Sequence, residues 1–174
     1  TSRYPCVAVS GSVVHIVWGD ERITNNEIFY KRSTDGGITW GEDILISYGS
    51  SFVANYPSLS VSGSNVHVVW LEDQILYNHS TDGGVTWATA TNLTNTTSLF
   101  WSPSISASDS KIHIAWRDER DGNNEIYYKR STDGGMNWGA DTRLTNNSAF
   151  SFNPSVAASD SVVHVVWFDD RDGN

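Results

Sequence analysis

The chain has 174 residues, of which 39% are hydrophobic, a composition that is adequate for a globular core and argues against a disordered chain. With 20 acidic residues against 11 basic ones the formal charge is -9, so phosphate backbones and anionic lipid surfaces should repel the protein. We therefore predict neither a nucleic-acid partner nor a membrane partner. The single cysteine, Cys6, excludes an internal disulfide, and we interpret it as a small buried residue.

Taken from the N-terminus, the first element is the segment YPCVAVSGSVVHIVW, in which two apolar stretches flank a turn. It begins at Tyr4, and similar segments begin at Tyr56, Ser102 and Asn153, with their prolines 52, 46 and 51 residues apart. The next element is STDGGITW from Ser33, which returns from Ser80 and Ser131 after 47 and 51 residues. Both landmarks keep one period, which indicates a tandem repeat of about fifty residues.

Within the second unit the pattern predicts four short strands, 58–62, 66–71, 75–79 and 86–92. The second of these is apolar almost throughout, as expected for a strand whose two faces are both covered by neighbouring sheets. We therefore predict an all-β fold, a partial β-propeller of four-stranded antiparallel blades. Three complete blades are expected at 4–47, 56–93 and 102–145, and half of a fourth at 153–174.

Each STDGG segment resembles the Asp box, or bacterial neuraminidase repeat, which reads Ser-x-Asp-x-Gly-x-Thr-Trp; the third copy has Asn137 where Thr is usual. The resemblance covers essentially the whole chain, and it implies a sialidase-like propeller with each box between the third and fourth strands. Because a residue repeated in every blade does not converge on one site, we interpret the box residues as structural. They are Ser33, Asp35, Gly37, Trp40, Ser80, Asp82, Gly84, Trp87, Ser131, Asp133, Gly135 and Trp138.

Histidine also repeats with the period. His15, His67, His113 and His164 occupy one position of successive second strands, so whole blades separate them, and we predict a structural role and no metal site. The stretch DERDGNNE, residues 118–125, is rich in oxygen ligands but lacks the alternating acidic ligands of an EF hand. We expect no cofactor, with calcium at this stretch as the alternative.

Strand alternation places the boxes on one face of the propeller and the loops 47–56, 94–101 and 145–153 on the opposite face. Aromatic rings beside hydroxyls and amides suit the apolar faces and hydroxyl edges of sugars, whereas the alternative for each ring is packing between blades. The aromatic residues in question are Tyr48, Phe52, Tyr56, Phe100, Trp101, Phe150 and Phe152.

Aspartate and arginine recur together on this second face. Asp20, Asp118 and Asp169 are followed two places later by Arg22, Arg120 and Arg171. Because the pairs repeat, we interpret them as loop braces. The alternative is that the aspartates are catalytic carboxylates and the arginines clamp a substrate carboxylate, which keeps Arg22 and Arg120 among the candidate ligand-binding residues.

The sialidase resemblance implies a Tyr nucleophile with a Glu partner, an acid/base Asp and an arginine triad, the first member of which lies in an Arg-x-Pro motif. Arg3 matches that motif in Arg3-Tyr4-Pro5, but no Tyr and Glu pair is singled out, and a sialidase has six blades. We therefore favour a glycan-binding or scaffold module over a catalyst. The alternative is an exo-sialidase or other glycoside hydrolase whose site is completed by further blades.

Two further expectations concern the surroundings of the protein. Open blade edges should be covered, either by a homo-oligomer that closes a ring or by further blades of a longer propeller. The glycan-related resemblance and the turn-rich repeats favour an extracellular or cell-surface location.

Overall fold

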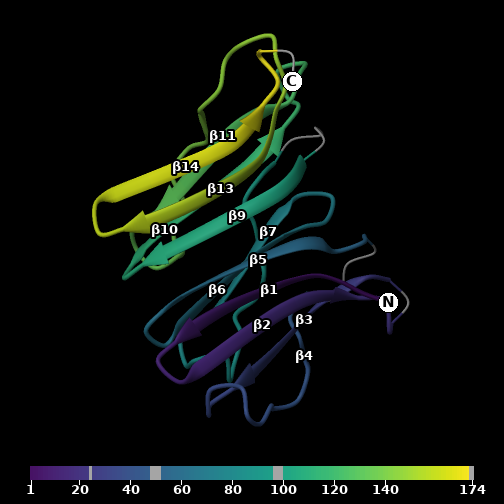
Figure 1. Ribbon diagram of the computed structural model, residues 1–174, viewed down its shortest axis with the longest axis vertical. Helices are drawn as coiled ribbons and strands as arrows, with labels where there is room; N and C mark the ends of the chain where they lie inside the picture. The colour runs from purple at the N-terminus through teal and green to yellow at the C-terminus, as the bar shows by residue number, and fades with distance from the viewer. Residues whose placement is uncertain (24, 48–51, 96–99, 173–174) are drawn as a thin grey trace.

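The computed structural model describes residues 1–23, 25–47, 52–95 and 100–172, and of Phe100 the backbone alone. The regular elements of this part of the chain are 14 β-strands in four antiparallel sheets (Figure 1). None of the described residues belongs to a helix long and apolar enough to cross a bilayer.

Three of the sheets have four strands in sequential order, and we call them blades 1, 2 and 3. Blade 1 comprises β1 (Ser2–Ser10), β2 (Val13–Asp20), β3 (Glu27–Ser33) and β4 (Ile44–Leu45). Blade 2 comprises β5 (Asn55–Ser62), β6 (Asn65–Leu71), β7 (Ile75–Ser80) and β8 (Thr91–Asn92). Blade 3 comprises β9 (Phe100–Ser108), β10 (Lys111–Asp118), β11 (Glu125–Ser131) and β12 (Thr142–Arg143). The fourth sheet, the half-blade, has β13 (Ser151–Ser159) and β14 (Val162–Asp169).

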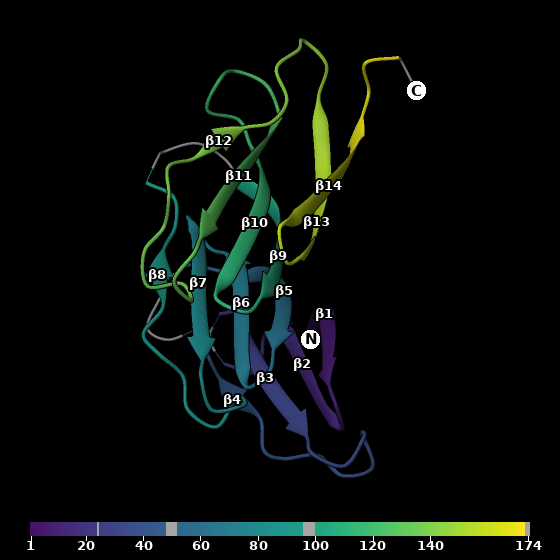
Figure 2. The same cartoon turned by 90° about the vertical axis from the view of Figure 1, so that its left-hand side faces the viewer.

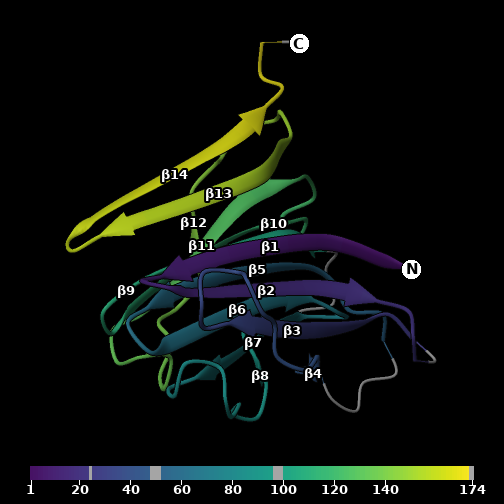
Figure 3. The ribbon, with the colours of Figure 1, turned by 60° about the horizontal axis from the view of Figure 1, so that its bottom comes forward.

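The sheets stack with their first strands side by side, β5 between β1 and β9, and β13 beside β9. Figure 2 shows β8 and β12 on the outer side of the stack, away from β13, and Figure 3 shows the β13–β14 hairpin at one end of it. This is the arrangement of propeller blades around an axis. The predicted fold class, three complete blades and half of a fourth, is confirmed.

Two details of the predicted strands are wrong. The fourth strand of blade 2 is Thr91–Asn92 and does not extend over 86–92, because the residues after the box turn serve to pack Trp87 against the preceding blade. The first strand, in contrast, begins earlier, at Asn55. It passes through Pro57 by a shift in register between Asn55 and Ser58, and Tyr56 there adopts a φ of 50°.

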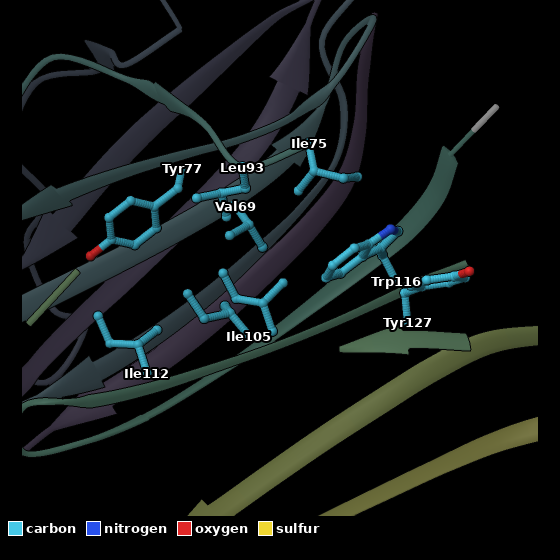
Figure 4. Packing of buried hydrophobic residues seen from close by; sticks show 9 residues of the cluster. Val69, Ile75, Tyr77, Leu93, Ile105, Ile112, Trp116 and Tyr127 are labelled. Carbon is cyan, nitrogen blue, oxygen red and sulfur yellow. The ribbon is translucent and has the colours of Figure 1, made fainter. Parts of the chain in front are cut away.

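Apolar residues fill the space between consecutive blades. Between blades 2 and 3, Val69, Ile75 and Tyr77 pack against Ile112, Ile114 and Trp116 (Figure 4). An equivalent cluster between blades 1 and 2 includes Trp70, which, like Trp116, is fully buried. Burying one such large side chain contributes roughly 1.5–3 kcal/mol, so contact between blades stabilises the fold substantially.

Serine residues tie the first strands together near the axis. The hydroxyls of Ser58 and Ser60 accept hydrogen bonds from amides of β9 at 3.3 and 2.9 Å, and that of Ser62 accepts one from the Asp109 amide, just after β9, at 2.9 Å. Ser104, Ser106 and Ser108 repeat this ladder toward β13. In β1, Cys6 occupies the position of Ser58. Cys6 is half-buried, so the prediction of a small buried residue is wrong. It lines a hollow near the axis that is described below.

Candidate functional site

The box turns hold their carboxylates within local hydrogen bonds. Asp35 accepts from the Ser33 hydroxyl at 2.6 Å, from the Thr39 amide at 2.9 Å and from the Thr39 hydroxyl at 2.5 Å. These bonds, the one from Ser33 first, lower the pKa of Asp35 to about 2. In the third box the Asn137 side-chain amide replaces the threonine hydroxyl and donates to Asp133 at 2.7 Å. The carboxylates are thus engaged in shaping the turn.

The boxes also lie at the boundary between blades. The hydroxyl of Tyr30 in blade 1 is 2.7 Å from Nδ1 of His15 and donates to the carbonyl of Gly83 in the blade 2 box at 3.4 Å. Trp87 of that box packs edge-on against the same ring, with centroids 4.8 Å apart. The tryptophan therefore packs across the blade boundary, and not merely beside its own hairpin.

The next pair of blades repeats this contact. Tyr77 is 2.8 Å from Nδ1 of His67 and donates to Gly134 at 3.5 Å, while Trp138 packs 5.0 Å from its ring centroid. His113 pairs in the same way with Tyr128 at 2.6 Å, whereas His164 is exposed on the half-blade. Within the described residues, no group of three or more His, Cys, Asp or Glu side chains could hold a metal ion.

On the opposite face, the predicted aspartate–arginine pairs are formed. In blade 3, Arg120 binds Asp118 and also Asp141, at 2.7 Å, and Lys129 binds Asp141 at 2.9 Å. Arg120 additionally lies over the ring of Tyr127, 4.3 Å from its centroid. We call this set of Asp, Arg, Asp, Lys and aromatic ring the rim network. Its carboxylates are held by cations of the chain itself.

Blade 1 has the same rim network. Arg22 binds Asp20 at 2.9 Å and Asp43 at 2.5 Å, Lys31 binds Asp43 at 2.7 Å, and the guanidinium lies 4.4 Å from the centroid of Phe29. Both candidate arginines, Arg22 and Arg120, therefore brace loops in this structure. In the half-blade, Arg171 binds Asp169 at 2.7 Å.

A hollow of about 370 Å³, which we call the axial opening, lies where the first strands converge. Its walls carry the residue before each proline, the proline itself and, from the first three units, the residue after it. These are Tyr4, Pro5, Cys6, Tyr56, Pro57, Ser58, Ser102, Pro103, Ser104, Asn153 and Pro154. The four residues that precede the prolines have φ between 48° and 52°, a left-handed conformation that non-glycine residues adopt rarely. Such backbone strain often accompanies functional sites.

Arg117 does not line this opening, but it interacts electrostatically with Tyr56, which does, and sequence reasoning missed it. Its guanidinium is 3.8 Å from the ring centroid of Trp101 and 5.4 Å from that of Phe152, and its Nε is buried with no hydrogen-bond partner among the described residues. Burial lowers the pKa of Arg117, although an arginine stays charged at neutral pH. The sequence signal was the lack of repetition, because the positions that correspond to Arg117 in the other units are Gly19, Leu71 and Phe168.

The predicted aromatic candidates separate into two groups. Tyr56, Trp101 and Phe152 were placed in loops but belong to the starts of β5, β9 and β13, because the strands extend further than predicted. Tyr56 packs against Tyr4 with ring centroids 4.4 Å apart, and its hydrogen bond with Tyr4 raises the pKa of Tyr56. These strand residues flank the axial opening.

Of the remaining candidates, Phe150 packs against Phe152, with ring centroids 6.0 Å apart. Phe52 and Phe150 are exposed residues of the connecting segments. Tyr48 lies outside the described residues, and of Phe100 only the backbone is described.

Arg3 lies on the outer face of blade 1. It binds Glu21 at 2.9 Å and lines a hollow of about 380 Å³ together with Trp18 and Arg22. These contacts of Arg3 are therefore not shared with Arg117, which packs against Trp101 and Phe152.

No protein-family model and no curated protein matches the chain. Solved structures do match. The GH93 α-L-arabinofuranosidase of Fusarium graminearum, in complex with arabinobiose, superposes with a TM-score of 0.68 at 19% identity over 89% of this chain and 52% of that one. The α-L-arabinanase of Penicillium chrysogenum, also with arabinobiose, gives a TM-score of 0.68 at 18% identity over 89% and 53%.

A mutant of Trypanosoma rangeli sialidase that displays trans-sialidase activity gives a TM-score of 0.72 at 14% identity, covering 98% of this chain and 34% of that one. At such identities the likeness concerns the fold alone, which is sialidase-like. The chain spans about half the length of the first of these structures and about a third of the last.

Proposed function

We propose that this protein is a glycan-binding β-propeller module of the Asp-box class, which binds saccharides at the axial opening. The observation that carries the proposal is Arg117, which stands beside the opening and interacts electrostatically with Tyr56 of its lining. Its guanidinium lies near the rings of Trp101 and Phe152, and its buried Nε lacks a partner among the described residues. The arginine offers charged N–H donors to sugar oxygens, and the adjacent rings offer apolar faces. Tyr56 and Tyr4 add hydroxyls at the same opening.

Binding without catalysis by this chain is supported by the lining of the axial opening. Its described residues are Tyr, Pro, Cys, Ser and Asn, with no Asp or Glu among them. In most glycoside hydrolase families, catalysis requires carboxyl groups at the scissile glycosidic bond. The box carboxylates do not supply one, since the turn hydrogen bonds engage them.

The solved structures support a carbohydrate ligand by analogy of fold, because two of them hold arabinobiose and all three are named as carbohydrate-active enzymes. The hydrogen-bond pattern of the three turns supports their assignment to the Asp-box class. An extracellular or cell-surface location follows as part of the same proposal.

A glycan array run beside fluorogenic sialoside and arabinofuranoside assays on one sample tests the proposal. We expect binding without turnover, weakened at least tenfold by Arg117→Ala and retained by the matched control Arg130→Ala, which alters an exposed arginine near a box. A loss of this size corresponds to about 1.4 kcal/mol or more. The absence of both binding and turnover would overturn the proposal, as would binding that Arg117→Ala does not weaken.

The second candidate function is an exo-acting glycoside hydrolase, such as a sialidase, completed by further blades. It is favoured by the enzymes among the solved structures and by the Arg-x-Pro pattern at Arg3. Turnover in the same assays that Arg3→Ala abolishes would establish it in place of a binding module.

The proposal includes association with further blades, from a second copy or from a longer propeller. Its support is the row of exposed apolar side chains on the two end sheets, Val7 and Val9 at 60% exposure and Val166 at 65%. Their counterparts between blades are covered, for example Leu59 at 6%. If a second copy supplies the further blades, light scattering should report a species larger than the monomer, and a stable folded monomer would contradict the association of two copies.

A further inference from the structure

The outer rim of blade 2 lacks the rim network that blades 1 and 3 share. Asn78 occupies the position of Lys31 and Lys129, and Ala90 occupies that of Asp43 and Asp141. Leu76 stands in the place of the aromatic ring, and the short connection from β6 to β7 provides no arginine that corresponds to Arg120. Every replacement is smaller than the group in the other blades, and of the four charged groups of the rim network only the first carboxylate has a charged counterpart, Glu72.

A cavity of about 530 Å³, which we call the rim cavity, lies at this position. Its lining includes Ile46 from blade 1 and Leu76, Asn78, Thr89, Ala90 and Asn92 from blade 2. The volume falls within the range of roughly 300–1,000 Å³ that is typical of small-molecule sites. The rim cavity therefore occupies space that side chains of the rim network fill in the neighbouring blades.

The lining of the rim cavity is polar but uncharged. Asn78 is 3% exposed; its Nδ2 donates to the Ile46 carbonyl at 3.3 Å, and its Oδ1 accepts from the His79 amide at 2.7 Å. An asparagine amide has a second N–H and a second lone pair, so Asn78 keeps hydrogen-bonding capacity after these two bonds. Thr89 and Asn92 are exposed and add a hydroxyl and a second amide, whereas Leu76 and Ala90 supply apolar surface.

We propose that the rim cavity binds one neutral sugar unit of a glycan, at a second site separate from the axial opening. Amide and hydroxyl groups match the hydroxyl edge of a sugar, the apolar side chains match its C–H face, and the lack of charged lining disfavours an ionic ligand. The inference rests on the proposed glycan-binding function for the class of ligand. Its position rests on the difference between the rims alone.

The test is isothermal titration calorimetry and side-chain amide NMR with arabinobiose and cellotriose as probes. The double variant Asn78→Lys with Ala90→Asp rebuilds the pair seen as Lys129 and Asp141, 2.9 Å apart, and should fill the rim cavity. We expect probe-dependent shifts of the Asn78 and Asn92 amides in the wild type and at least a tenfold loss of rim binding in the double variant.

A milder variant covers the case in which the double variant folds poorly. Asn92→Ala removes an exposed amide at the rim cavity, and its matched control Thr91→Ala alters the exposed neighbour that does not line it. Asn92→Ala should weaken rim binding several-fold and Thr91→Ala should not. Rim binding that neither the double variant nor Asn92→Ala weakens would overturn the rim site, as would a rim cavity in which neither probe shifts the two amides.

The axial variant separates the two proposals. Loss of binding in Arg117→Ala together with unchanged binding in the rim variants leaves the axial proposal standing and overturns the rim site. Rim binding that survives Arg117→Ala while axial binding is absent supports the rim site and overturns the axial one.

Discussion

Blades 2 and 3 have the same interior and different rims. Both bury a tryptophan completely, Trp70 and Trp116. In both, a histidine of the second strand contacts a tyrosine hydroxyl of the third strand. In blade 2, which a complete blade follows, that tyrosine also contacts the next box. At the rim, blade 3 has a network of charged residues and blade 2 has a cavity. The interior must cover a neighbouring sheet in every copy, whereas the rim faces water and is free to differ. Differences between repeats therefore point to function better than the repeated residues do.

The largest effect is expected from a substitution that breaks the rim network of blade 3. Asp118 is fully buried and accepts hydrogen bonds from the Trp116 indole at 3.1 Å and from Arg120 at 2.8 Å. Asp118→Asn removes the buried partner of the guanidinium and leaves Asp141 as its second one, so the free energy of unfolding should fall by about 3 kcal/mol, the lower end for a broken buried pair. Urea denaturation measures this.

The control for that substitution is Glu72→Gln in blade 2. Glu72 accepts from the Trp70 indole at 2.7 Å in the same way, but without the rim network. The loss should stay near 1 kcal/mol, as for one hydrogen bond. Equal losses for the two variants would show that the rims do not differ energetically.

The next prediction concerns pH and the shared interior. Burial, with a smaller contribution from the charge of His79, lowers the pKa of His67 from 6.5 to about 4. The unfolded chain then binds a proton that the folded chain does not, so stability is complete above pH 6.5 and decreases as pH falls toward 4. The total for this residue is about 3 kcal/mol.

Burial also lowers the pKa of His15 and His113, so they act in the same direction. Urea midpoints between pH 7 and pH 5 should fall, and the fall should be smaller in His67→Gln. A midpoint that is flat across this range in the wild type would refute the assignment of these histidines as buried and neutral.

Glycine substitutions test whether the blade boundary is alike in both places. A Cβ on Gly84 would lie 1.9 Å from the Tyr30 hydroxyl oxygen, and one on Gly135 would lie 2.2 Å from that of Tyr77. On Gly37 the nearest atom would be a carbon of the Trp40 ring at 3.7 Å. All three have φ between +84° and +92°, so alanine strains each backbone alike.

Gly84→Ala and Gly135→Ala should therefore cost about 2 kcal/mol more than Gly37→Ala, because only they force a side chain into a filled boundary. Thermal unfolding of the three variants measures the difference. Equal melting temperatures would mean that Tyr30 and Tyr77 yield without cost.

The smallest expected effect is on the stability of the Asn78→Lys, Ala90→Asp variant. A new ion pair at a partly exposed rim contributes up to about 1 kcal/mol. The melting temperature should stay equal or rise slightly, which makes this variant a fair test of sugar binding. A marked fall in melting temperature would indicate that the rim cavity cannot accept the network.

Much of the fold could be predicted because the same turn residues and the same apolar strands recur in each unit. The spacing of the boxes and of the apolar strands indicated the blades, since each four-stranded sheet needs a neighbour on both faces. Strand ends were predicted less well. The strands begin before their prolines and so include Tyr56, Trp101 and Phe152. The residue before each proline has a left-handed conformation, which local propensity does not predict. The pairing of Arg22 and Arg120 with aspartates followed from their spacing of two residues, but their second partners, Asp43 and Asp141, are 21 residues away.

By itself the sequence determined the blades, their order and the turns of the boxes, because these depend on periodicity and on hydrogen bonds within a few residues. Only the tertiary structure decided which arginine is buried against aromatic rings and where space is left open. Arg117 meets Phe152 from another sheet, and the rim cavity depends on Ile46 of the preceding blade. Such contacts join residues more than thirty positions apart, and no local pattern encodes them.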